Sequence, residues 1–262
     1  MSEPLRIAWL TTGRGEGSYG ALQYVLREIS RGLPVQLAVV FVNREPGEAA
    51  PTDRLMAMVR DAGIPLETLS SRRFRKERGG ERSRPGAPLP SWRRAFDEAV
   101  AERLARYGFD LGVLFGYMLI VTEPLFERYR LINDHPALPD GPVGPYEEVI
   151  LELIRQGARE SGSMYHVVTA EVDRGPAVSF CRFPIRDERN EELWRGFDPA
   201  RGTDDPLYLD IRRRGLARER PFVVETLRAI AEGRLAVPPA EPLDLTERVE
   251  ERVRLDEARS LR

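Results

Sequence analysis

Two histidines, one asparagine and one aspartate are the side chains best suited to chemistry in this sequence. His135 and His166 are the only histidines, so histidine-dependent chemistry has two possible centres. Asn133 precedes His135 by two positions, which places both side chains on one side of an extended segment. The amide N–H can stabilise an oxygen that gains negative charge, and the imidazole can donate to that oxygen or move a proton. The pair predicts acyl transfer without a nucleophilic serine or cysteine, and an ordinary loop histidine is the alternative interpretation.

Asp173 is the acidic candidate, because it follows the apolar segment that carries His166. A carboxylate in that place can orient an imidazole and stabilise its charged form. The competing interpretation is a turn aspartate before Gly175, since aspartate is common in turns. Cys181 lies in a predicted strand and reads as a small buried hydrophobe. With one cysteine, two histidines and no suitable carboxylate spacing, we expect no metal site.

Alternating apolar runs and helical patterns must position these side chains. Arg130 to Asn133 is one of the predicted strands, so His135 falls just beyond its carboxyl end, where ligands of α/β sheets bind. The other predicted strands are Leu5–Thr11, Val35–Val42, Ile64–Leu69, Leu111–Val121 as the central strand, and an antiparallel pair, Ser163–Thr169 with Ala177–Phe183. The predicted helices are Tyr19–Ile29, Thr52–Ala62, Ser91–Tyr107 with Ser91 as N-cap, Pro145–Gln156 and a helical pattern over Leu207–Leu235. This alternation predicts an α/β fold with a mostly parallel central sheet flanked by helices.

Two charged segments are predicted to lie at the surface and to bury little. Residues 70–90 concentrate Arg, Glu, Gly and Pro, which predicts a flexible loop that buries little. Residues 241–262 form a charged stretch with apolar residues at helical intervals, expected to pack weakly or not at all. We therefore predict a catalytic domain over 1–237 and a charged C-terminal tail with a helical pattern over 238–262.

Composition excludes several function classes. Among 262 residues, 42% are hydrophobic and 31% charged, which supports a globular core. A net charge of −2 argues against a nucleic-acid partner. Lys76 is the only lysine, which disfavours Schiff-base chemistry. No run approaches the roughly 20 apolar residues of a membrane span, no secretory leader is recognisable, and Cys181 is alone, so the cytoplasm is the expected compartment.

The combination of motifs resembles the folate-dependent formyltransferases, especially the glycinamide ribonucleotide transformylases. The resemblance extends over about residues 5–237. It is carried by Gly116-Tyr-Met118-x-Ile120, Asn133-x-His135-Pro-x-Leu-Pro, Ser163-x-x-His166-x-Val-x-x-Glu-Val-Asp173-x-Gly175-Pro, Arg218-Glu219 and the ending Ala231-Glu-Gly233-Arg-Leu235.

This resemblance implies a Rossmann-like formyltransferase that moves a formyl group from 10-formyltetrahydrofolate to a primary amine, with no metal. Asn133 and His135 would polarise the formyl oxygen, Asp173 would act with His135 on the amine proton, and His166 would support them. The family's folate site falls on Met118, Leu119, Ile120, Val121, Thr169, Ala170 and Glu171. The acceptor would be a small, phosphorylated amine, held by Gly13, Gly15, Gly17, Ser18 and Glu219; glycinamide ribonucleotide of purine biosynthesis is the first candidate.

Several positions depart from the family pattern. The transformylase phosphate loop Gly-Asn-Gly-Ser-Asn is replaced by Gly13-Arg-Gly-Glu-Gly-Ser18, which lacks both asparagines but can still bind an anion through backbone N–H groups. Leu119 replaces an arginine common in the transformylases. The segment after His135 is reshaped, and residues 187–204 form a longer polar insertion. We therefore expect the chain to retain formyl transfer, while the identity of its amine acceptor is left undetermined by the sequence.

Three alternatives stay open beside formyl transfer to glycinamide ribonucleotide or to another amine such as an amino sugar nucleotide. The same oxyanion site with water as acceptor would hydrolyse 10-formyltetrahydrofolate. A chain that kept the fold but lost its acceptor would be a folate- or nucleotide-binding protein. The spacing of Gly15, Gly17 and Gly20 also matches a dinucleotide fingerprint, although a nicotinamide enzyme would leave Asn133 and His135 unexplained. The sequence leaves the oligomeric state undetermined.

Overall fold

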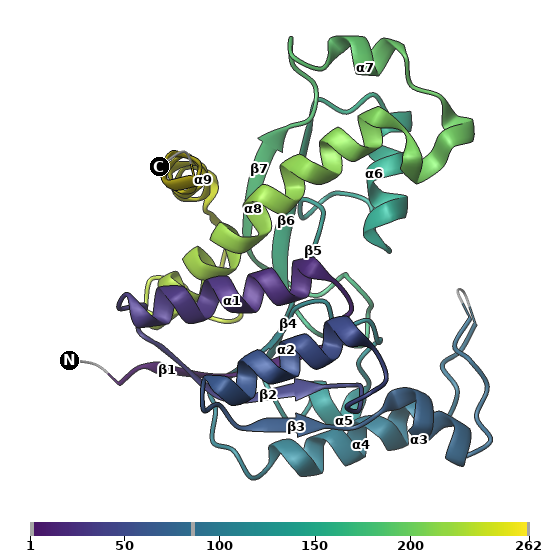
Figure 1. Ribbon diagram of the computed structural model, residues 1–262, viewed down its shortest axis with the longest axis vertical. Coiled ribbons are helices and arrows are strands. Elements are labelled where there is room, and N and C mark those ends of the chain that lie inside the picture. Colours follow the sequence, from purple (N-terminus) through teal and green to yellow (C-terminus); the bar gives the residue numbers. More distant parts are fainter. Residues whose placement is uncertain (1–2, 85–86, 261–262) are drawn as a thin grey trace. The chain divides into compact units, whose positions relative to one another are not determined.

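The computed structural model describes residues 3–84 and 87–260 (Figure 1). The chain divides into two compact units. Unit 1 comprises the chain up to Asn133 together with Val167–Gly175, and unit 2 comprises Asp134–His166 and the chain from Pro176 onward.

Unit 1 is built on a parallel sheet with the strand order β3-β2-β1-β4-β5. The strands are β1 (Leu5–Thr11), β2 (Val35–Val42), β3 (Leu66–Thr68), β4 (Leu111–Leu114) and β5 (Leu131–His135), whose first three residues belong to this unit. The predicted bounds of β1 and β2 are confirmed to the residue. Both strands are almost continuously buried, as expected for parallel strands covered on two faces.

Helices cover both faces of this sheet. They are α1 (Glu16–Ser30), α2 (Ala50–Asp61), α3 (Ser71–Glu77), α4 (Trp92–Leu104) and α5 (Glu123–Phe126). Ala8, Leu10 and Phe41 pack in one apolar cluster with Phe96 and Leu104 of α4. Because strand side chains alternate, Ile7, Trp9 and Val40 point to the opposite face, where α1 and α2 lie (Figure 1). The predicted α/β class with a mostly parallel sheet is confirmed.

The predicted central strand over Leu111–Val121 is wrong beyond Leu114. Gly116 has a φ of 62°, and a Cβ there would collide with Ser18 Oγ, so the chain turns instead of continuing the strand. The apolar composition of the segment comes from burial in a loop: Phe115, Tyr117 and Val121 are each less than 8% exposed. An apolar run alone does not distinguish these cases.

The predicted flexible loop over 70–90 is wrong for its first part, which forms α3. Ser70 Oγ accepts a hydrogen bond of 3.0 Å from the Arg73 amide and caps the helix. Phe74 is buried and packs edge-on against Phe96, with ring centroids 5.2 Å apart. Ser91 stands at the N-cap position of α4 as predicted but makes no capping hydrogen bond. Residues 85 and 86 lie outside the described residues.

A buried carboxyl in unit 1 gives a pH-dependent contribution to stability. Asp97 Oδ2 accepts hydrogen bonds of 2.7 Å from both the amide and the hydroxyl of Thr122. Burial, opposed by these bonds and by Arg93, raises the pKa of Asp97 to about 6. The folded state therefore holds this proton more tightly than the unfolded state, and stability from this group is lost as the pH rises from about 4 through 6.

Asp97→Asn should remove this pH dependence. As the pH rises from about 4 to 7, the parent should lose stability that the variant keeps. The difference in free energy of unfolding, variant minus parent, should therefore increase by on the order of 3 kcal/mol over this range. Urea denaturation across this range measures the difference, and exposed Asp61→Asn supplies the baseline for removing one carboxyl. A difference that stays constant with pH would contradict the assignment.

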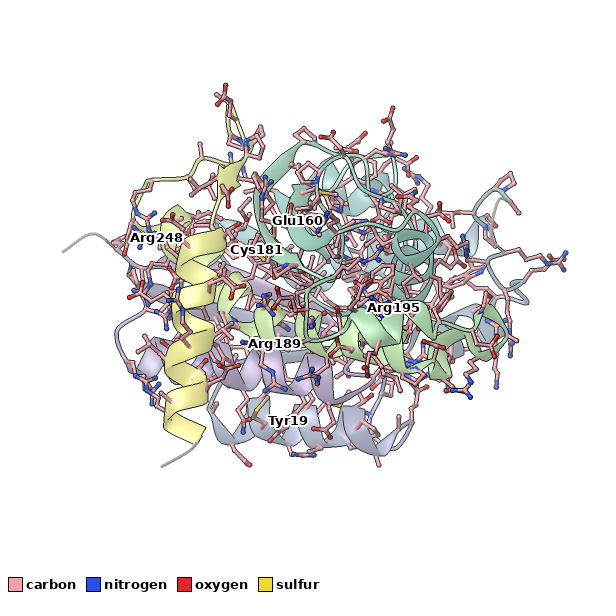
Figure 2. The ribbon with its side chains drawn as sticks, turned by 90° about the horizontal axis from the view of Figure 1, so that it is seen from above. Tyr19, Glu160, Cys181, Arg189, Arg195 and Arg248 are labelled. Carbon is pink, nitrogen blue, oxygen red and sulfur yellow. The ribbon has the colours of Figure 1, made fainter. Side chains whose placement is uncertain are left out.

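Unit 2 contains an antiparallel strand pair and the longest helix. Strands β6 (Glu160–Val167) and β7 (Ala177–Pro184) pair antiparallel, as predicted, and β8 (Leu243–Asp244) pairs parallel to β7. The helices are α6 (Tyr146–Arg155), α7 (Glu191–Arg195), a 3-10 helix (Pro199–Asp204), α8 (Pro206–Ala231) and α9 (Thr246–Ser260). Val149 and Leu153 of α6 pack with Leu207 and Ile211 of α8 in one apolar cluster. The polar stretch 187–204 lies around α7, where Arg189 and Arg195 are seen in Figure 2.

The C-terminal segment packs on unit 2, contrary to the expectation of weak packing. Leu245, Val249 and Val253 are at most 7% exposed. Two ion pairs join α8 to α9, namely Arg218 with Glu250 and Glu225 with Arg252. Arg248 marks α9 in Figure 2. The predicted helix is confirmed, and the division into 1–237 and 238–262 stays a prediction.

Leu245→Ala tests how much this segment stabilises unit 2. Leu245 is 2% exposed, so truncation should lower the free energy of unfolding by about 2–4 kcal/mol. Leu255→Ala on α9 is the matched control: it makes the same change at a side chain 50% exposed and should alter stability by less than about 0.5 kcal/mol. Denaturant titration of the two variants measures both values. Equal small effects would mean that the segment contributes no packing energy.

Candidate active site

Strand β5 carries Asn133 and His135 at its carboxyl end, on one side of the strand as the spacing predicts. His135 is 2% exposed. Its Nε2 lies 3.0 Å from the carbonyl oxygen of Pro142. A carbonyl oxygen only accepts, so Nε2 carries a proton, and in the neutral ring Nδ1 holds the lone pair. The loop after β5 therefore sets both the orientation and the tautomer of the imidazole.

The two histidines lie together within unit 2. His166 comes from β6 and is 2% exposed. Its ring centroid is 6.2 Å from that of His135, at an interplanar angle of 81°. Two neighbouring strands thus present the only two imidazoles of the chain to one place.

Asp173 lies in the loop between β6 and β7, in unit 1, with a strained backbone. Its φ of 55° makes it the one non-glycine residue with positive φ among residues 3–84 and 87–260. Gly175 approaches the carbonyl of Val167 so closely that a Cβ there would overlap it. A left-handed aspartate in a loop closed by such an approach is the kind of strain found at functional sites.

Three predicted folate residues, Thr169, Ala170 and Glu171, lie in the same loop. Thr169 Oγ1 accepts a 3.3 Å hydrogen bond from the amide of Glu171. Ala170 and Glu171 are exposed. They stand beyond the end of β6, where the family pattern puts the donor.

The predicted folate segment Met118–Val121 follows the turn at Gly116 rather than continuing a strand. The Met118 amide donates to Thr12 Oγ1 at 3.0 Å, and the Ile120 carbonyl accepts from the guanidinium of buried Arg93. Met118 is 53% and Ile120 40% exposed, whereas Val121 is buried. The loop is thus fixed by its backbone while apolar side chains remain in contact with solvent.

The glycine segment of unit 1 is shorter than predicted, because α1 begins at Glu16 rather than Tyr19. Gly17 and Ser18 therefore belong to the first turn of the helix. Gly13 has a φ of 64°, and Thr52 Oγ1 donates to its carbonyl at 3.1 Å. Gly15 is the N-cap and provides no side-chain cap, so the first N–H groups of α1 have no side-chain acceptor there.

Glu219, predicted to bind the acceptor, lies on α8 and is 8% exposed. Its Oε1 is 2.6 Å from a guanidinium nitrogen of Arg212. The guanidinium of Arg212 also stacks on Tyr146, 4.2 Å from the ring centroid. The carboxylate is therefore already engaged inside unit 2.

A buried polar pair was not predicted. Asp134 lies between Asn133 and His135 on β5; its Oδ1 is shielded from solvent without a hydrogen-bond partner among the described residues. The Tyr165 hydroxyl on β6 is also shielded from solvent and has no hydrogen-bond partner among the described residues. Burial, reinforced by the charge of Glu219 and opposed by Arg212, raises the pKa of Asp134 well above its usual range. The available signal was an acidic residue inside the short strand, directly between the two candidate residues.

Burial also accounts for Cys181, which is 1% exposed on β7 (Figure 2). Removal from water raises the pKa of its thiol, so it stays protonated. This agrees with its interpretation as a small buried hydrophobe. No helix in the part of the chain that the structure describes is both long and apolar enough to cross a membrane.

Comparison with known proteins identifies the family. A family model described as "Formyl transferase" matches residues 6–194. The chain is 32% identical over 95 residues to phosphoribosylglycinamide formyltransferase of Escherichia coli, covering 36% of this chain and 44% of that protein. It is 31% identical over 87 residues to the Bacillus subtilis enzyme of the same name, covering 32% of this chain and 44% of that protein. The matched part spans less than half the length of these curated relatives.

Solved structures extend the similarity to most of the chain. Glycinamide ribonucleotide transformylase 1 from Symbiobacterium toebii aligns with a TM-score of 0.65 and 29% identity, covering 92% of this chain and 94% of that one. Phosphoribosylglycinamide formyltransferase from Coxiella burnetii shares the fold with a TM-score of 0.63, at 24% identity over 88% of this chain and 89% of that one.

The chain belongs to the formyl transferase family. The resemblance seen in the sequence is confirmed at the level of the family and of the Rossmann-like fold, and the class of enzyme is a formyltransferase.

Proposed function

We propose that this protein transfers a formyl group from 10-formyltetrahydrofolate to the primary amine of a small phosphorylated acceptor, in the cytoplasm. The observation that carries the proposal is the end of β5, where Asn133 and His135 share one side of the strand and a second imidazole, His166, lies 6.2 Å from the first. This is the residue set that the resemblance of the sequence to the folate-dependent formyltransferases implies.

Each residue has a distinct role in this proposal. The amide of Asn133 donates to the formyl oxygen as it gains negative charge. His135, held by Pro142, adds a second polarising group and can move a proton. Asp173 stabilises the charged imidazole and helps to remove the proton from the attacking amine. The acceptor nitrogen adds to the formyl carbon to give a tetrahedral intermediate. The bond to the donor nitrogen then breaks, and that nitrogen takes up a proton in place of the one removed from the amine.

The residues around Met118 suit the pterin part of the donor. Met118 and Ile120 expose apolar side chains on a loop whose backbone is fixed by Thr12 and Arg93. A flat, partly apolar ring system binds well to such a preformed surface with a few polar groups. Leu119, Val121 and Thr169–Glu171 complete the proposed donor site.

Glycinamide ribonucleotide is the first acceptor to test. The names of the relatives support it, and Gly13, Gly15, Gly17 and Ser18 supply a helix start suited to a phosphate. Glu219 is proposed to face the acceptor with its Arg212 partner rather than as a lone carboxylate.

Spectroscopic detection of tetrahydrofolate formation tests the proposal. Purified protein would be given 10-formyltetrahydrofolate with glycinamide ribonucleotide, with a panel of phosphorylated amines, and with no acceptor. Turnover that depends on one amine supports transfer and names the acceptor. Absence of turnover and of donor binding under all three conditions would refute it.

Hydrolysis of the donor is a second candidate, favoured by the engagement of Glu219 with Arg212. If the Glu219 carboxylate, paired with Arg212, does not bind an amine, water can attack the formyl carbon instead. Formate release at the same rate with and without amine would establish this activity in place of transfer.

A further inference from the structure

Three arginines emerge from the carboxyl ends of three adjacent parallel strands in unit 1. Thr11, Val42 and Thr68 pair in one row across β1, β2 and β3. Arg14 follows this row on the first strand, Arg44 on the second and Arg72 on the third, within four residues in each case.

Backbone hydrogen bonds hold the starts of these three loops together. The amide of Asn43 donates to the carbonyl of Thr11 at 3.2 Å, and the amide of Ser71 donates to the carbonyl of Asn43 at 3.2 Å. The residues that carry the three guanidinium groups are thus connected through one fixed backbone edge.

The guanidinium group of Arg44 is repelled by those of Arg14 and Arg72. Arg44 has its pKa lowered by partial burial, by Arg72 and by Arg14, with Glu48 as the opposing charge. None of the three takes part in an ion pair or hydrogen bond within residues 3–84 and 87–260. Three like charges beside one opposing carboxylate, that of Glu48, cost free energy that a bound anion would offset.

The nearby carboxylates are engaged elsewhere. Glu16 and Glu45 each pair with an arginine outside the cluster, whereas Glu48 stays close enough to Arg44 to raise its pKa, so three guanidinium groups face one carboxylate. The pairs are Glu16 with Arg54 at 3.0 Å, Glu45 with Thr68 at 2.8 Å, and Glu48 with Ser70 at 2.5 Å.

A buried amide lies in the same edge. Asn43 is 1% exposed, and its Oδ1 has no hydrogen-bond partner among the described residues. An amide oxygen only accepts, so the missing partner is a donor, such as a water or a guanidinium N–H that could itself bridge to an anion, and not an anion oxygen. Thr52 joins this edge to the glycine segment, because its hydroxyl donates to the carbonyls of Thr12 and Gly13.

We propose that Arg14, Arg44 and Arg72 form a second anion subsite beside the glycine segment, and that the acceptor therefore carries a diphosphate rather than a single phosphate. This rests on the proposed formyl transfer to a phosphorylated amine, and it favours an amine with a diphosphate over glycinamide ribonucleotide, whose single phosphate would leave the arginine subsite empty. The N–H groups at the start of α1 take one phosphate, and the three guanidinium groups take the next. A terminal phosphate carries nearly two negative charges near neutral pH, so the three guanidinium groups are enough to neutralise it.

Calorimetric titration with inorganic pyrophosphate and inorganic phosphate tests the inference without the folate donor. We expect pyrophosphate to bind at least about 10-fold more tightly than phosphate. Arg44→Gln should remove most of that advantage and leave phosphate binding within about 3-fold. Arg60→Gln is the matched control, because it removes the same charge from an exposed position in the last turn of α2. Thermal melting of each variant establishes that it is folded.

The outcomes separate this inference from the proposed function. Equal binding of the two anions, or equal effects of the Arg44 and Arg60 substitutions, would overturn the subsite. Binding of a tetraglutamate peptide through Arg44 in preference to pyrophosphate would overturn the diphosphate and assign the arginines to a polyanionic donor tail. Arg44-dependent pyrophosphate binding by a protein without formyl transfer would uphold the subsite while the proposed function fails.

Discussion

The His135→Asn variant is expected to lose formyl transfer by about 10²–10⁴-fold in kcat while keeping its fold. Asparagine retains a hydrogen-bonding group near the Pro142 carbonyl, which the histidine Nε2 contacts at 3.0 Å, but it cannot take up or release a proton. Loss of proton movement, rather than loss of packing, should therefore dominate. Stopped-flow measurement of single turnovers with saturating donor and acceptor isolates the chemical step.

A comparison with His166→Asn sharpens this test. Both side chains are 2% exposed, so the two substitutions disturb packing to a similar degree. If His135 carries the chemistry and His166 supports it, the second variant should lose much less activity at an equal melting temperature. Equal losses in the two variants, or a parent-like rate for His135→Asn, would remove His135 from the proposed role.

Asp173→Asn is expected to lower kcat by about 10²–10⁴-fold with no loss of stability. Asparagine is also tolerated at positive φ, so the backbone at 55° is retained while the negative charge is removed. The expected loss is that of a carboxylate that orients and stabilises an imidazole. Steady-state rates with the accepted amine, together with thermal melting, measure the two effects.

Two further substitutions separate charge from backbone at this position. Asp173→Gly removes the carboxylate but permits positive φ, so it should be inactive and at least as stable as the parent. Asp173→Ala should be equally inactive and about 1 kcal/mol less stable, because alanine lacks the local side-chain hydrogen bonding that lets aspartate adopt positive φ. Activity in the glycine variant would show that the strained loop, and not the carboxylate, is what the reaction needs.

A double substitution tests whether the two residues act together. If Asp173 works through His135, the variant carrying both His135→Asn and Asp173→Asn should be no slower than the poorer single variant. Multiplied losses would instead assign the two side chains to independent steps.

The strands that position the chemistry could be predicted because their signals are local. Leu5–Thr11 and Val35–Val42 are continuous apolar runs bounded by polar or glycine residues, and both boundaries match the structure. The segment after Leu114 has the same composition, yet it turns at Gly116 because Ser18 occupies the space that a side chain would need. That contact joins residues about 100 positions apart, which no local pattern reveals.

Composition also predicted the wrong structure for two charged segments, because a few apolar residues in each pack against residues far away in the sequence. Phe74 lies in a charged stretch, but it packs on Phe96 and so α3 forms. Leu245 and Val249 lie in a charged tail, but α8 and β7 cover them. Burial in both cases depends on what lies opposite in space, so a count of charges along the chain underestimates it.

By itself, the sequence determined the family, the α/β class and the residue types of the proposed site. The spacing of Asn133 and His135 places them on one side of a strand whatever the rest of the fold does, since side chains alternate. Only the tertiary structure decided that Asp134 is buried without a partner, that Glu219 is engaged by Arg212, and that Arg14, Arg44 and Arg72 share one edge. Desolvation and charge interactions depend on distances between strands and helices far apart in the chain, and those distances exist only after folding.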